Sequence, residues 1–243
     1  ALAALATVSI TFSIFLVKLS IALSASDMAV LKFSVQVGLC VPLLIYYRAS
    51  PVSGAARDLR WLLVGRSLAG AISLLAAYFS IKMIHFGDTI AIRYCAPVLA
   101  VLLARFFLQE RLNGSHLAAC VLVALGLLCV ARPAWLFGAA LGQPGSFNVV
   151  LGTCLAVLCA LSASSTFLFV KKLIKYRNSV NFAVVILYFS VAGLALSALI
   201  SILIYASSAE ARRALLFTRH YIVRDVGVAL LAGAVNFFGQ VCF

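Results

Sequence analysis

Long apolar runs with few charged residues constrain this chain more than any other feature. A membrane-spanning α-helix needs about 20 mostly apolar residues, whereas a strand of a membrane β-barrel alternates apolar and polar residues over about 10 positions. The runs here are long and unbroken, so they predict an all-α polytopic membrane protein. We predict eight membrane-spanning helices, over residues 2–24, 28–47, 61–81, 88–108, 115–132, 147–170, 182–205 and 223–243.

The composition excludes the soluble classes of protein. Hydrophobic residues make up 65% of the 243 residues, and only 10% are Asp, Glu, Lys or Arg. Soluble domains carry about 25% of these charged residues. The net charge is +13, but Lys and Arg gather in the cytoplasmic loops of membrane proteins. We therefore expect this chain to contact a lipid bilayer and no nucleic acid.

The residue pattern gives no support for a metal site, a cofactor or an enzyme. The 7 cysteines lie in apolar stretches, form no C-x-x-C pair and have no histidine at ligand spacing. We recognise no nucleophile–base pair, phosphate-binding loop or metal-ligand set in the sequence. We therefore predict a protein without a cofactor or a metal that is not an enzyme.

Loop charges predict the orientation in the membrane. On one side, nine basic residues lie in connectors or at span ends: Arg48, Arg57, Arg60, Arg105, Arg111, Lys171, Lys172, Lys175 and Arg177. The other side has five, which are Lys82, Arg132, Arg212, Arg213 and Arg219. The more basic side should face the cytoplasm, which places the N-terminus there. The pattern predicts a multi-pass integral membrane protein and leaves the plasma membrane and the endomembranes equally open.

Short sequence matches in a common order indicate an internal duplication. Residues 15–19 resemble 169–173, and the Phe-Ser-Val of 33–35 recurs at 189–191. The first copy has five predicted helices, and an odd number inserts the second copy in the opposite orientation. We predict a first repeat over 1–133, a linker over 134–146 and an incomplete second repeat of three helices over 147–243. The chain would then hold eight helices of a ten-helix parent protein.

The fourth predicted helix and its flanks carry a motif that resembles a known family. The motif begins with Gly-Asp-Thr at 87–89, contains Ala-Pro-Val at 96–98 and ends with Leu-Gln-Glu-Arg at 108–111. This pattern resembles that of the EamA-type drug/metabolite transporter superfamily, and nearest within it solute carrier family 35, subgroup G. The residues that match the family motif are Asp88, Pro97, Glu110 and Arg111.

The resemblance implies a fold and a class of activity. It implies ten helices in two inverted five-helix repeats, with a central cavity and alternating access. It also implies substrates among nucleotide sugars, organic anions or other small metabolites. Two positions depart from the family pattern: Arg93 stands where a small or polar residue is expected, and Lys32 where the family often has Arg.

Four basic residues lie several positions inside predicted spans, namely Lys18, Lys32, Arg66 and Arg93. A Lys or Arg at the centre of the bilayer costs about 2.5–3.5 kcal/mol. One interpretation is that these side chains reach the lipid headgroups, and Arg93 has Asp88 nearby as an alternative partner. The functional interpretation is a basic cavity that attracts an anionic substrate. We recognise no acid inside the spans for proton or cation coupling, which favours exchange or facilitated movement of an anion.

Other polar and small residues are placed inside the predicted spans. Gln36, Tyr78, Asn236 and Gln240 are candidates for orienting a substrate, with hydrogen bonding between helices as the alternative. We interpret Asp27 and Asp88 as helix caps and expect kinks at Pro42 and Pro97. Small residues recur every four positions in three predicted spans and predict a tight bundle, at Gly65, Ala69, Ser73 and Ala77, at Ala96, Ala100 and Ala104, and at Gly152, Ala156, Ala160 and Ser164.

We predict a secondary membrane transporter that moves a small organic anion or related metabolite by alternating access. Two alternatives remain open. One is a nucleotide-sugar transporter of the same fold, and the other is a protein that binds membrane partners and transports little. The expected partners are a small-molecule substrate, anionic in charge, and the lipid bilayer. A homodimer or another membrane-protein partner also remains open.

Overall fold

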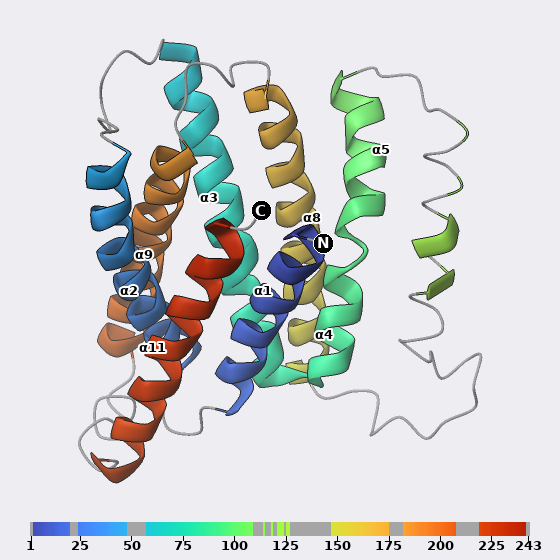
Figure 1. The fold of residues 1–243 in the computed structure, drawn as a ribbon. Coiled ribbons are helices and arrows are strands. Elements are labelled where there is room, and N and C mark those ends of the chain that lie inside the picture. The colour runs from blue at the N-terminus through green and yellow to red at the C-terminus, as the bar shows by residue number, and fades with distance from the viewer. Residues whose placement is uncertain are drawn as a thin grey trace.

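The fold is all-helical wherever a computed structural model describes it. Secondary structure is described for residues 2–19, 24–47, 57–108, 114, 118, 121–123, 125–126, 147–174 and 182–207, and for 219–241. The helices are α1 (Leu2–Leu19), α2 (Ala25–Tyr46), α3 (Arg57–Met83), α4 (Phe86–Arg93), α5 (Ala96–Leu108), α8 (Phe147–Ile174), α9 (Phe182–Ser207) and α11 (Arg219–Val241). Figure 1 shows them as one upright bundle. The predicted all-α class is confirmed.

Five helical segments are long and apolar enough to cross a membrane. They are Ala25–Tyr46, Leu59–Met83, Phe86–Phe107, Val149–Leu173 and Phe182–Ser207. The apolar parts of the first and last helices, Val8–Leu19 and Asp225–Val241, are shorter. Most of the predicted span 115–132 lies outside the described residues. The chain is therefore a multi-pass membrane protein, as predicted. The inverted repeat and the domain boundaries stay predictions.

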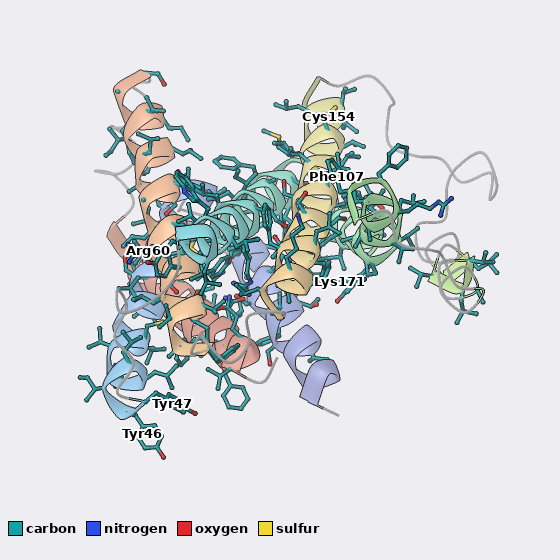
Figure 2. All side chains as sticks on the ribbon, turned by 90° about the horizontal axis from the view of Figure 1, so that it is seen from above. Tyr46, Tyr47, Arg60, Phe107, Cys154 and Lys171 are labelled. Carbon is teal, nitrogen blue, oxygen red and sulfur yellow. The ribbon has the colours of Figure 1, made fainter. Side chains whose placement is uncertain are left out.

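Helix α3 lies at the centre of the bundle (Figures 1 and 2). It packs most extensively against α8 and also against α9. Helix α2 packs against α9 and α11, and α1 packs against α11. Helices of the first predicted repeat thus contact helices of the second at every major interface, and the contact between α5 and α8 is one of these.

Small residues of two of the predicted stripes lie at the interface between α3 and α8. A Cβ atom added to Gly65 would lie 3.0 Å from the ring of Phe169, so the two helices approach closely there. The Ser73 hydroxyl donates to the carbonyl of Cys159 (3.1 Å). The Ser80 hydroxyl donates to the carbonyl of Gly152 (2.9 Å). Small side chains allow these direct contacts between helix backbones and side chains.

A second close approach joins α2 to α9. The ring of Phe33 packs edge-on against the ring of Phe189, with 5.6 Å between their centroids. A Cβ atom on Gly193 would lie 2.2 Å from the Phe33 ring, so only glycine leaves room for that ring. Phe33 is fully buried in the main core cluster, with Met28 and Leu74. This packing fixes the face of α2 that is directed into the bundle.

The fourth predicted span is two helices rather than one. Helix α4 ends at Arg93, a turn follows at Tyr94 and Cys95, and α5 begins at Ala96. Proline at 97 has no N–H to donate to the carbonyl of Arg93, which would be its partner in a continuous helix. The predicted kink is therefore a break, one turn earlier than the proline itself. Pro42, in contrast, lies inside the single helix α2.

The prediction that Asp27 is a helix cap is wrong. Ser24 is the N-cap of α2, and its side chain accepts from the backbone N–H of Asp27. The Asp27 carboxylate accepts hydrogen bonds from Ser24 (2.7 Å), Ser201 (2.6 Å) and the hydroxyl of Tyr205. Asp27 therefore connects the start of α2 to the end of α9 by hydrogen bonds. The residue at the N-cap of α4 is His85 rather than Asp88, which lies in the first turn.

Candidate functional site

A cavity of about 330 Å³ lies in the middle of the bundle. Its walls come from α1, α3, α8, α9, α11 and the broken segment α4–α5. Most of the lining is apolar. The polar and charged residues that line it are Thr11, Arg66, Ser73, Arg93, Tyr94, Thr166, Asn236 and Gln240. Four of the eight predicted substrate-binding residues thus meet in one cavity, namely Arg66, Arg93, Asn236 and Gln240.

Two arginines give this cavity a positive charge. Arg66 projects from the first half of α3, and its Nε atom is buried without a hydrogen-bond partner among the described residues. Arg93 ends α4, and its Nη1 atom donates to the sulfur of Cys159 (3.6 Å). The described residues that line the cavity include no Asp or Glu. Charge in an apolar interior is costly unless it is paired, and both guanidinium groups carry N–H donors with which an anion can form hydrogen bonds.

The helix break places Arg93 at the cavity. Because α4 stops at Arg93 and the chain turns at Tyr94, the basic side chain and Pro97 both reach the lining. The hydroxyls of Tyr94 and Thr11 hydrogen-bond to each other (2.8 Å) and link the turn to α1. Arg93 donates to Cys159, and the structure gives it no ion pair with Asp88, which was the alternative partner considered from the sequence.

Three amide side chains connect α2 to α11. Gln36 Nε2 donates to Gln240 Oε1 (2.5 Å), and Asn236 Nδ2 donates to Gln36 Oε1 (3.3 Å). Gln36 and Asn236 are buried. The interpretation as hydrogen bonding between helices is therefore confirmed for these three residues. Asn236 and Gln240 also line the cavity, so the same amides offer N–H donors and C=O acceptors to a bound molecule.

Lys32 and Tyr78 lie deep in the bundle rather than at its surface. Both are fully buried, with 0% of each side chain exposed. Lys32 Nζ lies 4.7 Å from the centroid of the Phe33 ring and 5.5 Å from that of Tyr78. Among the described residues, neither Nζ nor the Tyr78 hydroxyl has a hydrogen-bond partner. The interpretation that Lys32 reaches the lipid headgroups is therefore wrong.

Lys18 does not line the cavity. Its ammonium donates to the carbonyl of Ile81 (2.7 Å) and to that of Ile84 (3.3 Å) at the C-terminal end of α3. The last carbonyls of a helix lack partners within the helix, and a positive charge is favourable there. Lys18 therefore has a structural role, because these hydrogen bonds join α1 to the end of α3.

The remaining residues of the family motif divide into two groups. Pro97 lines the cavity, whereas Asp88 is exposed in the first turn of α4. Glu110 and Arg111 lie outside the described residues. The part of the chain that the structure describes holds no cluster of three or more His, Cys, Asp or Glu residues that could bind a metal.

Four polar residues of the lining were not predicted from the sequence, namely Thr11, Ser73, Tyr94 and Thr166. Hydroxyl side chains are common on apolar membrane helices, so their residue type gives little signal. Tyr94 is different, because it directly follows Arg93 and precedes Pro97 by three positions. Its position between a charged residue inside a predicted span and a proline could have indicated that Tyr94 lines the site.

Sequence comparison gives a family match. The model of the EamA-like transporter family matches residues 1–132. An uncharacterized membrane protein of Saccharomyces cerevisiae is 28% identical over 79 residues, which are 32% of this chain and 19% of that protein. An uncharacterized transporter of Helicobacter pylori is 29% identical over 68 residues, which are 28% of this chain and 23% of that protein. The matched stretches thus span less than a quarter of these curated relatives.

One solved crystal structure shares the fold. It superposes on this chain with a TM-score of 0.52 at 21% sequence identity. The superposition covers 98% of this chain and 83% of that one. The shared arrangement therefore extends beyond the matched family segment to nearly the whole helical bundle.

Proposed function

Because this chain belongs to the EamA-like transporter family, we propose that it moves a small organic anion across a membrane and binds it in the central cavity. The family is one of transporters rather than enzymes, and such a protein handles a small-molecule substrate within a lipid environment. The narrower relation to solute carrier family 35, subgroup G, stays a prediction. The single observation that carries the anion proposal is the pair of cavity arginines, Arg66 and Arg93, without a carboxylate beside them in the described lining.

Arginine suits this role better than lysine. Its planar guanidinium presents donors in a fixed fork that matches a carboxylate or a phosphate. Such charge-assisted hydrogen bonds contribute about 1.5–3 kcal/mol each. The Asn236 and Gln240 amides add neutral donors to the lining of the cavity. Two cations and two amides thus supply both attraction and orientation.

The cavity size favours a compact anion over a nucleotide sugar. Its volume is about 330 Å³, at the lower end of the roughly 300–1,000 Å³ range of ligand pockets. A nucleotide sugar needs room for a base, a ribose, a diphosphate and a sugar. We therefore rank the nucleotide-sugar alternative second.

Alternating access requires that one end of the bundle be closed at a time. Two sets of contacts close the end where α1, α3 and α9 finish and α2 begins. Lys18 binds the last carbonyls of α3, and Asp27 binds Ser201 and Tyr205 of α9. We propose that these contacts form the closed gate of one state and that they separate in the other.

Charge supports an orientation of the bundle. The exposed cations Arg60, Arg105, Lys171 and Lys172 lie at the other end, where α2, α5 and α8 finish and α3 begins (Figure 1). Tyr46 and Tyr47 project outward near the same end (Figure 2), as interfacial aromatic residues do. We propose that this end and the N-terminus face the cytoplasm.

Counterflow in liposomes tests the proposal. The purified protein is reconstituted, and uptake of labelled carboxylates and phosphorylated metabolites is measured against the same unlabelled compound inside. We expect saturable uptake of at least one anion, and we expect Arg66→Gln or Arg93→Gln to weaken its apparent affinity at least about tenfold. The matched control is Arg105→Gln, which removes an exposed charge of α5.

The outcomes separate the alternatives. Uptake confined to nucleotide sugars would favour the second-ranked function. The membrane-partner alternative would be favoured if the folded protein moves no compound. In that case Arg66→Gln would also leave its binding to membrane-protein partners unchanged. Equal activity of the wild type and both arginine variants would contradict the anion-binding role of the cavity.

A further inference from the structure

We propose that Lys32 and Tyr78 form a second anion subsite beneath the central cavity, so that the substrate is a dianion with two separated charged groups. The proposal rests on the transport function proposed above and specifies its substrate class. It starts from two buried polar groups whose hydrogen-bonding capacity is unused within the described part of the chain.

Both groups are unusual in a folded protein. Lys32 and Tyr78 are fully buried, yet Lys32 Nζ and the Tyr78 hydroxyl form no hydrogen bond among the described residues. Ser13 is near the Tyr78 hydroxyl, but its own hydroxyl donates to the carbonyl of Ala232 (2.8 Å). The great majority of buried polar side-chain atoms have such a partner, and an exception calls for a physical reason. A functional group that an anion completes is one such reason. The 5.5 Å from Lys32 Nζ to the Tyr78 ring centroid places the two side chains side by side.

Helical spacing places this pair next to the cavity. Tyr78 is one turn beyond Leu74 on α3, and Leu74 lines the cavity. Lys32 is one turn before Gln36 on α2, and Gln36 hydrogen-bonds to Asn236 and Gln240, which line the cavity. Since α2 and α3 run in opposite directions (Figure 1), both displacements point toward the same end of the bundle. The subsite therefore continues the cavity by about one helical turn.

The surrounding charges leave Lys32 without a protein counter-ion among the acids whose side chains are described. Asp27 binds Ser24, Ser201 and Tyr205. Asp225 attracts Lys82, and Asp88 is exposed in the first turn of α4. The charge that acts on Lys32 is instead that of Arg93, which repels it.

An anion would relieve each of these costs at once. One carboxylate or phosphate oxygen would accept from the Lys32 ammonium and from the Tyr78 hydroxyl. Its negative charge would also offset the repulsion between Lys32 and Arg93. The rings of Phe33 and Tyr78 compensate the ammonium only in part, because a cation–π contact is weaker than an ion pair in an apolar interior.

The second charged group of the same substrate would bind Arg66 and Arg93 in the central cavity. The amides of Gln36, Asn236 and Gln240 connect α2 to the cavity lining and can donate to the linking part of the molecule. A monoanion would fill only one of the two positions. The geometry therefore predicts a preference for dianions over monoanions of matched length.

The test uses matched ligand pairs that differ by one charged group. The probes are mono- and dicarboxylates of four, five and six carbons. Each is measured as a competitor of counterflow and as a stabiliser in thermal unfolding of the reconstituted protein. We expect at least one dianion to bind at least about tenfold more tightly than its monoanion partner.

The variants locate the preference. Lys32→Met and Tyr78→Phe should each lower the affinity for the preferred dianion about tenfold or more. The affinity for its monoanion partner should stay within about twofold of the wild-type value. Arg66→Gln should weaken both members of the pair. Lys172→Met is the matched control, because it removes an exposed lysine of α8 and should change neither. Tyr78→Phe removes one oxygen atom only, so it keeps the test valid if Lys32→Met does not fold.

The failures are distinguishable. If no member of any pair competes or stabilises, the proposed anion transport is wrong and the subsite is wrong with it. If anions bind but mono- and dianions bind equally, or if Lys32→Met and Tyr78→Phe leave the preference intact, transport stands and the subsite is overturned. If both variants weaken every ligand alike, Lys32 and Tyr78 act on the shape of the cavity, and the subsite is likewise overturned.

Discussion

Lys32 Nζ lies 4.7 Å from the centre of the Phe33 ring, one residue along the same helix, and has no hydrogen-bond partner among the described residues. The aromatic ring occupies the place where a carboxylate would be expected. Because the side chain is 0% exposed, water does not compensate the ammonium from the surface. The Lys32 ammonium is thus a buried polar group whose desolvation destabilises the fold. It lies next to the cavity that we propose as the substrate-binding site.

Lys32→Met should raise the stability of the protein. Burying an ion costs several kcal/mol even after relaxation, whereas the cation–π contacts that the substitution removes contribute about 0.5–2 kcal/mol. The desolvation cost is larger, so we expect the unfolding temperature in detergent to rise by at least about 2–4 °C. A fall in the unfolding temperature would show that the ammonium stabilises the fold through a partner.

Gly193→Ala should destabilise the contact between α2 and α9. The new Cβ would lie 2.2 Å from the Phe33 ring, which is buried and has no free space to enter. Overpacking of this kind costs about 1–3 kcal/mol, and thermal unfolding measures it. The matched control is Gly38→Ala in α2, where a Cβ meets no atom within 4 Å. We expect the control to be neutral or slightly stabilising, because alanine favours a helix over glycine by about 1 kcal/mol.

Tyr205→Phe should loosen the end of the bundle where α2 begins. The Tyr205 hydroxyl donates to the Asp27 carboxylate, which also accepts from Ser201. Hydrogen bonds to charged groups contribute about 1.5–3 kcal/mol. We expect Tyr205→Phe to lower the free energy of unfolding by that amount. In a double variant that also carries Asp27→Asn, the carboxylate charge is already gone, so Tyr205→Phe should cause no further loss. Ser207→Ala is the control, because Ser207 is exposed and its hydroxyl donates to the carbonyl of Ile204 in the same helix (3.1 Å). Fully additive losses in the double variant would contradict this contact.

Pro97→Ala should slow transport without destabilising the fold. The substitution restores an N–H that can donate to the carbonyl of Arg93, so α4 and α5 can join into a straighter helix. Arg93 would then leave its position in the cavity lining. We expect a lower maximal rate of anion counterflow with an unchanged or higher unfolding temperature. Pro42→Ala is the comparison, since Pro42 lies in α2 and does not line the cavity. An equal loss of rate in both variants would argue against a specific role of the break.

Much of this architecture follows from the sequence. Only helices and closed β-barrels satisfy the backbone in lipid, and unbroken apolar runs lack the alternation of barrel strands, so they predict the all-α polytopic fold. Arg66 and Arg93 stand out for the same reason, since a basic residue inside an apolar run is costly without a purpose. Asn236 and Gln240 share one face of their helix by spacing alone. All four line the cavity.

The outcomes that the sequence does not predict depend on packing between distant segments. Lys18 and Lys32 lie at similar depths of their predicted spans, yet Lys18 binds the end of α3 and Lys32 is enclosed in the core. Only the rotation of each helix in the bundle separates the two cases. The bond from Tyr205 to Asp27 joins residues 178 positions apart, and no local pattern connects them. The break at Tyr94 precedes the proline that causes it, so its position depends on backbone geometry.

The central claim is that the cavity selects its substrate by negative charge. The most direct measurement is counterflow of a charge series of one carbon skeleton in liposomes, namely a carboxylate, its neutral amide and its amine. We predict that the wild-type protein and Arg105→Gln move the anion alone, and that the double variant Arg66→Gln, Arg93→Gln loses the anion without gaining the amide or the amine. Transport of the neutral or cationic member at the anion's rate, or an unchanged anion rate in the double variant, would contradict the account.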